Sequence, residues 1–317
     1  MFGEQPSLAF GLVVLLFALG EFAWRKRSGR GYDLGSLGGN LGVMLGQGLS
    51  RLLTGGIVTA AMFAVFSLSP WHWALDDWRT WAIGFVVLEF FYYWQHRFSH
   101  TIRWLWASHA VHHSANEFTL PAAFRLGWTS MISGGWVVLL PMALMGFHPL
   151  LIATLLTLNL RYQYFLHTEA VGKLGPLEWV FNTPSHHRVH HGSNPAYLDT
   201  NFGGVLIVFD RLFGTFVEER ADMPVAYGLT KRLASNNPVV IAFHEWANLW
   251  RDFRNAKSLR EVWRALFGRP SDLAESGAGK EARAMPVLHA TIVQLGCAAT
   301  IRHKSSSRRQ THPFEGR

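Results

Sequence analysis

The sequence predicts an all-α integral membrane protein, with about four or five membrane helices carrying a cytoplasmic helical cap. Hydrophobic residues make up 49% of the 317-residue chain and charged residues only 16%, whereas charged residues are roughly 25% of soluble domains. The apolar residues are also concentrated in runs of helical length. Composition and distribution together therefore favour helices that cross a bilayer.

The first apolar run covers residues 8–19 and extends to about Trp24, where a basic cluster follows it: Arg25, Lys26, Arg27 and Arg30. A cleavable signal peptide carries its positive charge before the apolar run. No basic side chain precedes this run. We therefore expect an uncleaved span whose carboxyl end faces the cytoplasm, because basic loops stay on that side.

Four further spans are predicted. The second covers residues 41–68, and because it is rich in glycine and contains Arg51 it is either broken or packed against its neighbours. A loop with three tryptophans at interface positions leads to the third span, residues 81–96. The fourth (131–145) and fifth (150–165) are short and joined by GFHP. They form either a hairpin that dips into the bilayer or a thin crossing.

Alternating these spans from the first one places every clustered histidine on the cytoplasmic face. We expect four regions: N-terminal membrane helices over 1–80, a catalytic domain over 81–218, a helical region over 219–270 and a disordered basic tail over 271–317. The net charge of +8 fits this topology and contact with anionic lipid, and no nucleic-acid motif is present. The single cysteine, Cys297, excludes an internal disulfide and a cysteine metal site.

Three histidine clusters stand in segments compatible with helix: HRFSH, HAVHH and HRVHH. Residues three or four apart share a helix face, so each cluster aims several imidazoles at one region. Eight imidazoles exceed the needs of one ion but suit two ions with about four ligands each. The expected ligands are His96, His100, His109, His112, His113, His187, His190 and His191, with His167 of FLHT as a possible ninth.

Other histidines are treated differently. His186 directly precedes the third cluster and is either a ligand or a group facing the ligands or the substrate. The isolated ones are expected to be structural or solvated: His72, His148, His244, His289, His303 and His312.

An all-nitrogen site suits several metals. Zinc hydrolases usually need three protein ligands and a water, whereas redox chemistry on a membrane substrate favours two iron ions, with zinc possible in purified samples. Ligand imidazoles usually donate their second N–H to an acceptor. The candidate acceptors are Glu117, Glu169, Asp199 and Asn201, each of which is otherwise a helix cap or a solvated residue.

The order HRFSH, WASHAVHHS, FLHT, NTPSHHRVHHGSNP and DTNFGGVLIVFDRLFGTF resembles the fatty acid hydroxylase/sterol desaturase superfamily over about residues 81–218. That resemblance implies a membrane-bound di-iron oxygenase acting on lipids, with the eight clustered histidines as the catalytic iron ligands. The stretch from His167 to Gly204 is similar to the alkylglycerol monooxygenases, which use tetrahydrobiopterin to split ether lipids. The chain departs from these relatives in FTLPAAFRLGW, where Leu126 and Gly127 replace polar residues.

Local signals in the last two motifs are also specific. In NTPSHHRVHHGSNP, Pro184 suits a first helical turn, Ser185 is a plausible N-cap and Gly192 suits a helix end with positive φ. The glycines of NFGG and FG suit turns or close backbone approaches. Arg188 and Arg211 either anchor the chain at a membrane surface or hold a lipid phosphate.

The sequence therefore predicts an oxidoreductase that hydroxylates or desaturates a lipid C–H bond with O2 and two external electrons, its site on the cytoplasmic side of a bacterial inner membrane. No Rossmann, haem or iron–sulfur motif is present. A partner must therefore supply the electrons: a ferredoxin, a cytochrome b5-like protein or a tetrahydropterin. The alternatives are a non-catalytic membrane metal binder or transporter, and a zinc-dependent membrane hydrolase, although a zincin HExxH is absent.

Overall fold

The computed structural model describes residues 8–270, which form helices and no β-strand. The α-helices are α1 (Leu8–Arg27), α2 (Leu34–Phe66), α3 (Trp78–Thr101), α4 (Arg103–His113), α5 (Leu140–Leu144), α6 (Pro149–Tyr164), α7 (Pro184–His190), α8 (Val208–Phe213), α9 (Pro238–Asn255) and α10 (Leu259–Phe267). Short 3-10 helices are η1 (Leu120–Phe124), η2 (Gly135–Leu139), η3 (Gly175–Trp179) and η4 (Pro195–Tyr197). The predicted all-α class is confirmed for this part of the chain. The expected basic tail, Cys297 and the last three histidines lie outside the described residues.

Two helices, α1 and α2, are long and apolar enough to cross a membrane, with mean hydropathies of 1.8 and 1.6. Only 11% and 6% of their most apolar windows are buried, which differs from the mostly buried core helix of a soluble protein. Despite its glycines and Arg51, α2 is unbroken over 33 residues. Its first turn is capped by the Asp33 carboxylate, which accepts a hydrogen bond from the amide of Ser36 at 3.1 Å.

The other predicted spans are helical as well. The third corresponds to α3, the fourth to η2 and α5, and the fifth to α6. These segments and α2 share an apolar core, which consists of Met62, Leu88, Leu139, Met142, Ala143, Phe147, Leu151, Ile152 and Leu155. Their predicted passage through the bilayer stays a prediction.

The GFHP connection between α5 and α6 is a tight turn. Gly146 has φ +88°, and an added Cβ there would overlap the backbone of Trp71, so only glycine fits. The indole N–H groups of Trp71 and Trp73 each donate to the carbonyl of Met145 at 2.9 Å. His148 accepts a hydrogen bond from the amide of Leu150 and thereby caps α6, a structural role that agrees with the prediction for this residue.

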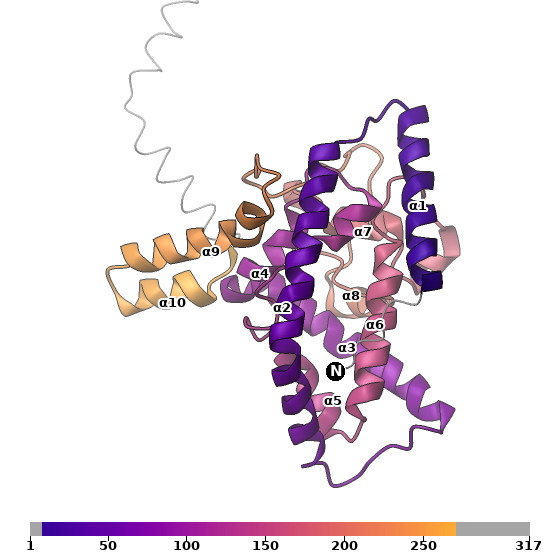
Figure 1. Ribbon diagram of the computed structural model, residues 1–317, viewed down its shortest axis with the longest axis vertical. Helices are drawn as coiled ribbons and strands as arrows, with labels where there is room; N and C mark the ends of the chain where they lie inside the picture. Colours follow the sequence, from indigo (N-terminus) through magenta and orange to yellow (C-terminus); the bar gives the residue numbers. More distant parts are fainter. Residues whose placement is uncertain (1–7, 271–317) are drawn as a thin grey trace, which may run out of the picture. The chain divides into compact units, whose positions relative to one another are not determined.

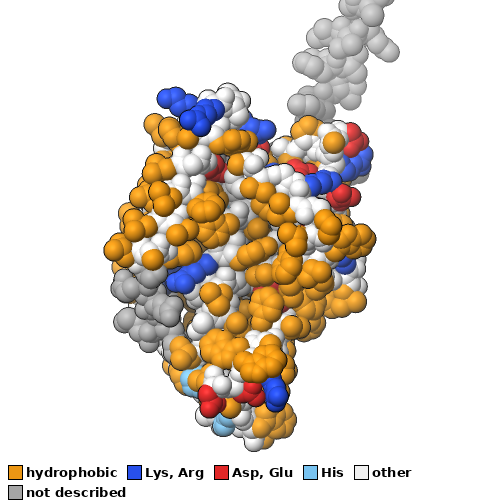
Figure 2. Space-filling view, turned by 90° about the vertical axis from the view of Figure 1, so that its right-hand side faces the viewer, with side chains coloured by type: hydrophobic (Ala, Val, Ile, Leu, Met, Phe, Trp, Pro, Cys, Tyr) orange, Lys and Arg blue, Asp and Glu red, His pale blue; other side chains and the backbone are white. Residues whose placement is uncertain are grey.

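A second, smaller core joins α2, α4 and α9 through Val43, Val111 and Ile241. Beside it, buried Arg103 of α4 pairs with Glu245 at 3.1 Å and Asp252 at 2.8 Å, both on α9. In Figure 1, α1, α2 and α6 run upright, whereas α9 and α10 extend to one side at the height of α4. Figure 2 shows a face covered largely by hydrophobic side chains, with basic side chains gathered at its upper end.

Candidate metal centre

Nine histidines from four parts of the chain converge in two adjacent groups. The first group contains His96, His100, His109, His113 and His190, and the second contains His112, His167, His187 and His191. Within each group, one ring nitrogen per histidine lies within 4.8 Å of every other. All nine predicted ligand residues are therefore brought together, and each group is large enough for one ion.

The two HxxHH motifs each divide between the groups. On α4, His109 and His113 are four residues apart and face the first group, whereas His112 faces the second. On the segment that begins with α7, His187 and His191 face the second group and His190 faces the first. Each motif thus gives its i, i+4 pair to one group and its i+3 residue to the other, because the adjacent i+3 and i+4 side chains lie about 100° apart around a helix.

The ring nitrogens are spaced as ligands of shared ions would be. The Nε2 atoms of His96 and His109 lie 3.1 Å apart and those of His109 and His113 3.2 Å apart. In the second group, Nε2 of His167 lies 3.2 Å from Nε2 of His112 and 3.1 Å from that of His187. Nitrogens bound to one ion at about 2.0–2.1 Å lie about 2.8–3.4 Å apart for angles between square and tetrahedral. The donor set therefore fits two metal ions.

Several other Nε2 atoms are buried without a hydrogen-bond partner in the described residues, namely those of His100, His190 and His191. A buried polar atom left without a partner costs free energy. Coordination of an ion would satisfy each of them, which is a second observation that fits a metal centre.

Backbone carbonyls fix the orientation of four rings. Each ring donates its Nδ1–H to one carbonyl: His96 to Phe202 (2.8 Å), His112 to Arg125 (3.2 Å), His167 to Gln163 (2.8 Å) and His190 to Thr200 (2.9 Å). This assignment leaves Nε2 as the lone-pair nitrogen, which is the atom a metal binds.

The environment also keeps the rings neutral. Burial lowers the pKa of His112, His113 and His190 well below the ordinary histidine value, and the other histidines nearby lower it further. Because only the neutral imidazole binds a metal ion, these rings do not have to lose a proton at pH 7 before they coordinate.

The loop that carries two of these carbonyls is held by two buried carboxylates. Asp210 of α8 accepts hydrogen bonds from the amides of Phe202 and Gly203, both at 2.7 Å. Glu89 of α3 accepts from the amides of Val205 (2.7 Å) and Leu206 (2.9 Å). The NFGG motif therefore lies between two fixed acceptors, and its glycines permit close approach, as predicted: a Cβ on Gly204 would overlap Asn159.

The four candidate acceptors for the ligand rings make different contacts in the structure. Only Asp199 lies beside a ligand, with its carboxylate 3.5 Å from Nδ1 of His100. Asn201 instead ties the chain together, since it donates to the carbonyls of His186 and Val217. Glu117 and Glu169 are not acceptors for the ligand rings, because they form ion pairs with Arg25 of α1.

His186 belongs to neither group. It is 1% exposed, its ring packs edge-on against Phe216, and its Nε2 lies 3.8 Å from the carboxylate of Glu178. The sequence left open whether His186 is a ligand or a group that faces the ligands or the substrate. The structure places it outside both histidine groups.

Three details of NTPSHHRVHHGSNP also need correction. The N-cap of α7 is Thr183, and Ser185 donates to Glu219 instead. Gly192 does not have positive φ; it is required because a Cβ would come within 2.9 Å of the Tyr197 ring. Arg188 does not lie on a membrane surface: it is 7% exposed and pairs with Glu219 at 2.7 Å.

Arg211 also has an internal partner. It donates to the carbonyl of Glu178 at 3.1 Å, and its guanidinium lies 3.7 Å from the centre of the Phe216 ring. By contrast, Gly214 of FG ends α8 with a φ of +70°, which fits the turn predicted for this glycine.

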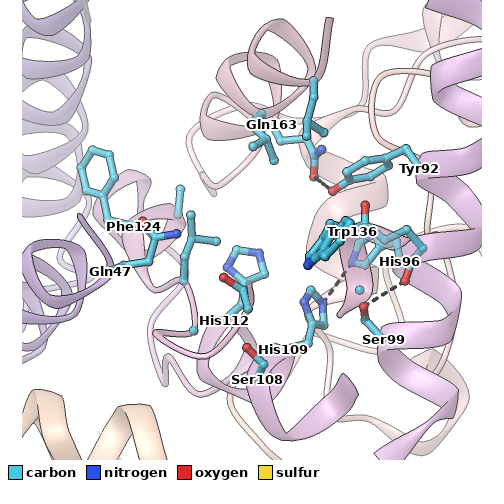
Figure 3. A pocket seen from close by; sticks show the side chains of 18 of the residues that line it. Gln47, Tyr92, His96, Ser99, Ser108, His109, His112, Phe124, Trp136 and Gln163 are labelled. Carbon is cyan, nitrogen blue, oxygen red and sulfur yellow. Dashed lines mark hydrogen bonds between the residues drawn. The ribbon is translucent and has the colours of Figure 1, made fainter. Parts of the chain in front are cut away.

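A cavity of about 430 Å³ leads to the histidines. Its wall contains His96 and His109 of the first group and His112 and His167 of the second, together with apolar side chains such as Leu126, Trp136, Leu139, Leu156 and Leu160. In Figure 3, His109 and His112 project into the cavity, and Tyr92 and Gln163 lie on its other side. An apolar chain in this space would reach both groups.

The backbone carbonyls that orient the rings were not identified from the sequence, because every residue has one. Arg125 illustrates this. Its carbonyl accepts from His112, and its fully buried guanidinium donates to Asn40, Ser36 and Ser114. In the sequence, the only indication of this structural role of Arg125 is that a basic residue stands beside apolar ones. The departures at Leu126 and Gly127 both fall on the cavity wall.

Comparison with known families gives a match to the fatty acid hydroxylase model over residues 81–215, the segment that carries all nine histidines. This segment belongs to the fatty acid hydroxylase family. The resemblance expected from the sequence is therefore confirmed.

Among curated relatives, the alkylglycerol monooxygenase of Danio rerio is 38% identical over 265 residues, which cover 82% of this chain and 57% of that protein. The alkylglycerol monooxygenase of Homo sapiens is 40% identical, covering 66% of this chain and 45% of that protein. An ornithine lipid hydroxylase of Rhizobium tropici is 26% identical, covering 68% and 66%. The chain spans about half the length of the first two relatives. No solved structure matches it.

Proposed function

We propose that this chain is a membrane-embedded oxygenase that hydroxylates a lipid C–H bond. One oxygen atom of O2 enters the C–H bond, and two external electrons with two protons reduce the other to water. The observation that carries the proposal is the apolar cavity whose wall holds histidines of both groups. The names of the relatives, monooxygenase and lipid hydroxylase, support the same reaction class.

In this proposal the nine histidines hold two metal ions, and the donor set and family favour iron. The ions would supply activation of O2 and removal of hydrogen from the lipid. The protein's own residues orient the rings and supply ligands that resist oxidation. Carbonyls such as those of Phe202 and Thr200 hold the rings in the binding tautomer, and neutral imidazoles withstand oxidation that thiolates would not.

The cavity would position the lipid. Its apolar residues can bury an alkyl or acyl chain, which lowers the free energy of binding by roughly 0.8 kcal/mol for each CH2 group buried. Tyr92 donates to Gln163 at 3.1 Å, so two polar groups of the wall satisfy each other beside an apolar ligand. Eight of the nine histidines are buried and His109 is half-buried, which limits the access of bulk water to the reacting carbon.

The membrane arrangement is part of the same proposal. The apolar faces of α1 and α2 would lie in the bilayer, with α3, α5 and α6 completing the predicted spans and the histidine groups near the cytoplasmic surface of a bacterial inner membrane. The electron donor would then be cytoplasmic: a ferredoxin, a cytochrome b5-like protein or a tetrahydropterin.

Lipid analysis of cells with and without the chain tests the proposed reaction. We expect a lipid that gains one oxygen atom only when the chain is expressed, and loss of this product in His190→Ala and His187→Ala. The matched control is His244→Ala, because His244 lies outside both groups and bonds to the carbonyl of Ile241. A lipid that loses two hydrogens would indicate desaturation instead. An unchanged product in His190→Ala would refute the site.

The two rival functions are separated by a second measurement. A metal binder or transporter would hold metal without consuming O2 when lipid and reductant are added, and a zinc hydrolase would release a lipid fragment without O2. The proposed oxygenase consumes O2 only when lipid and reductant are both present. Metal content and O2 uptake measured on the same reconstituted sample therefore discriminate the three.

A further inference from the structure

The described residues that line the cavity reaching the histidine groups include basic but no acidic side chains. Two arginines, Arg51 and Arg161, are among its lining residues. No aspartate or glutamate of the described chain lines it. The remaining wall is apolar or carries neutral polar groups. The charged residues of the wall therefore favour an anion within or at the mouth of the cavity.

The charge of Arg51 costs free energy if α2 crosses the bilayer as proposed. It lies in the middle of the long apolar helix α2, four residues and one turn after Gln47, which lines the same cavity. Within residues 8–270 it has no carboxylate partner. Ionisable residues inside a membrane helix are expensive, and they usually mark a site where a partner or ligand binds.

Arg161 approaches the cavity from a different helix. It lies near the carboxyl end of α6, and its guanidinium lies 4.7 Å from the centre of the Phe10 ring of α1. Phe10 lines the cavity too. A ring held against the guanidinium restricts its position, so the second cation is placed by the fold.

The cavity that both arginines line also reaches both histidine groups. In Figure 3, Gln47, which is one turn before Arg51, lies across the cavity from His96. Arg161 lies in the last turn of α6, six residues before His167 of the second histidine group. An amphiphile held at the arginines could therefore extend its apolar part to the histidines.

We propose that Arg51 and Arg161 bind the anionic head group of the lipid, a carboxylate or a phosphate, and so restrict the substrate to anionic amphiphiles. This inference rests on the proposed function, because it names the substrate class of the same cavity. Guanidinium groups suit both anions, since their paired N–H donors match two oxygens.

Binding without turnover tests the inference. The full chain is reconstituted in nanodiscs of zwitterionic phosphatidylcholine and titrated at pH 8, without O2 or reductant, with dodecyl phosphate, dodecanoate or dodecanol. We expect each anionic probe, or only one of the two if the site distinguishes phosphate from carboxylate, to bind at least tenfold more tightly than dodecanol. Equal affinity for all three would overturn the inference.

Variants assign the selectivity to the two arginines. Arg51→Met and Arg161→Met should each weaken binding of the anionic probe about tenfold and leave dodecanol binding unchanged. Arg51→Lys should weaken it less than Arg51→Met, because lysine keeps the charge but lacks the paired donors. The matched control is Arg79→Met, since Arg79 is exposed at the start of α3 and outside the cavity. Anion binding that persists in both methionine variants would contradict the assignment, and unchanged dodecanol binding shows that the variants are folded.

The two proposals can fail separately. Charge-selective binding without any oxidised lipid would leave this inference standing and refute the oxygenase. Oxidation of a neutral lipid, with no charge selectivity in the titrations, would support the oxygenase and refute the role of the two arginines.

Discussion

The backbone carbonyl of Phe202 accepts a hydrogen bond from Nδ1 of His96 at 2.8 Å, although 106 residues separate the two in the sequence. The contact couples the loop after α7 to helix α3 and fixes the ring that contributes to the first histidine group. Whatever holds the Phe202 peptide therefore also helps to position the first histidine group. Asp210 does so, by accepting from the Phe202 amide at 2.7 Å.

Replacing Asp210 by alanine should loosen this loop. The change leaves two buried amides and the Thr215 hydroxyl without their acceptor, at a cost of about 1–3 kcal/mol for each unsatisfied group. We expect a markedly lower unfolding temperature and loss of metal from the first group. Thermal unfolding and metal analysis check this, with Asp222→Ala as a control, since that carboxylate pairs with Arg220 at the surface. Normal metal content in Asp210→Ala would contradict the role.

The same residue predicts a pH dependence. Burial raises the pKa of Asp210 to about 6, above its value of about 3.9 in an unfolded chain. The folded protein then binds the proton more tightly, so the stability that this group contributes falls as the pH rises from about 4 to about 6. The total change is about 3 kcal/mol. The stability difference between wild type and Asp210→Asn, measured by unfolding between pH 4 and 8, should follow this curve; a flat difference would rule it out.

We expect Glu89 to be as important for the integrity of the site as one of the nine histidines, although it forms no hydrogen bond with any of them. Its carboxylate accepts from the amides of Val205 and Leu206 and from the side chain of Asn159, and it is 1% exposed. Glu89→Ala should cost roughly 3–5 kcal/mol, because several buried donors lose their partner. Glu89→Gln keeps an acceptor oxygen and should cost less. Equal stability of wild type and Glu89→Ala would refute this.

Gly204 provides a test of packing around the same carboxylate. A methyl group at this position would overlap the Asn159 side chain, which already donates to Glu89. We expect Gly204→Ala to destabilise the protein by about 1–3 kcal/mol. Gly172→Ala is the matched control, because no atom lies within 4 Å of the position that its added methyl group would take. Indistinguishable unfolding temperatures for the two variants would show that the loop yields easily.

The convergence of the clustered histidines could be predicted from the sequence because it follows from their helical spacing. HxxxH and HxxHH bring rings to one side of a helix, so the spacing alone identified His96, His100 and both triplets. Their division into two groups could not be predicted, because it depends on how α3, α4 and α7 are rotated against each other. That rotation is set by tertiary contacts such as the Phe202 carbonyl at His96.

Carboxylates near the clusters were harder to interpret. Glu117 and Glu169 follow ligand residues closely in the sequence, but the fold places Arg25 between them. Glu89 lies within an apolar run and gave no signal of its own, because its partners are backbone amides more than 100 residues away. The five predicted spans are all helical, but only α1 and α2 have the length and apolarity of membrane helices among the residues that the structure describes.

The division of each triplet predicts which ion a variant loses. His190→Ala removes a ligand from the first group and His187→Ala removes one from the second. Each variant should retain about one ion per chain, and the double variant should retain almost none. Metal analysis of the three purified proteins checks this. A single variant that loses both ions would indicate one shared site instead of two.

Metal analysis of the purified wild-type chain, combined with anomalous scattering to locate the ions, tests the central claim most directly. The account predicts two transition-metal ions per chain, one among His96, His100, His109, His113 and His190 and one among His112, His167, His187 and His191. A chain that holds no ion at these histidines when supplied with iron or zinc, or that binds its ions elsewhere, would contradict it.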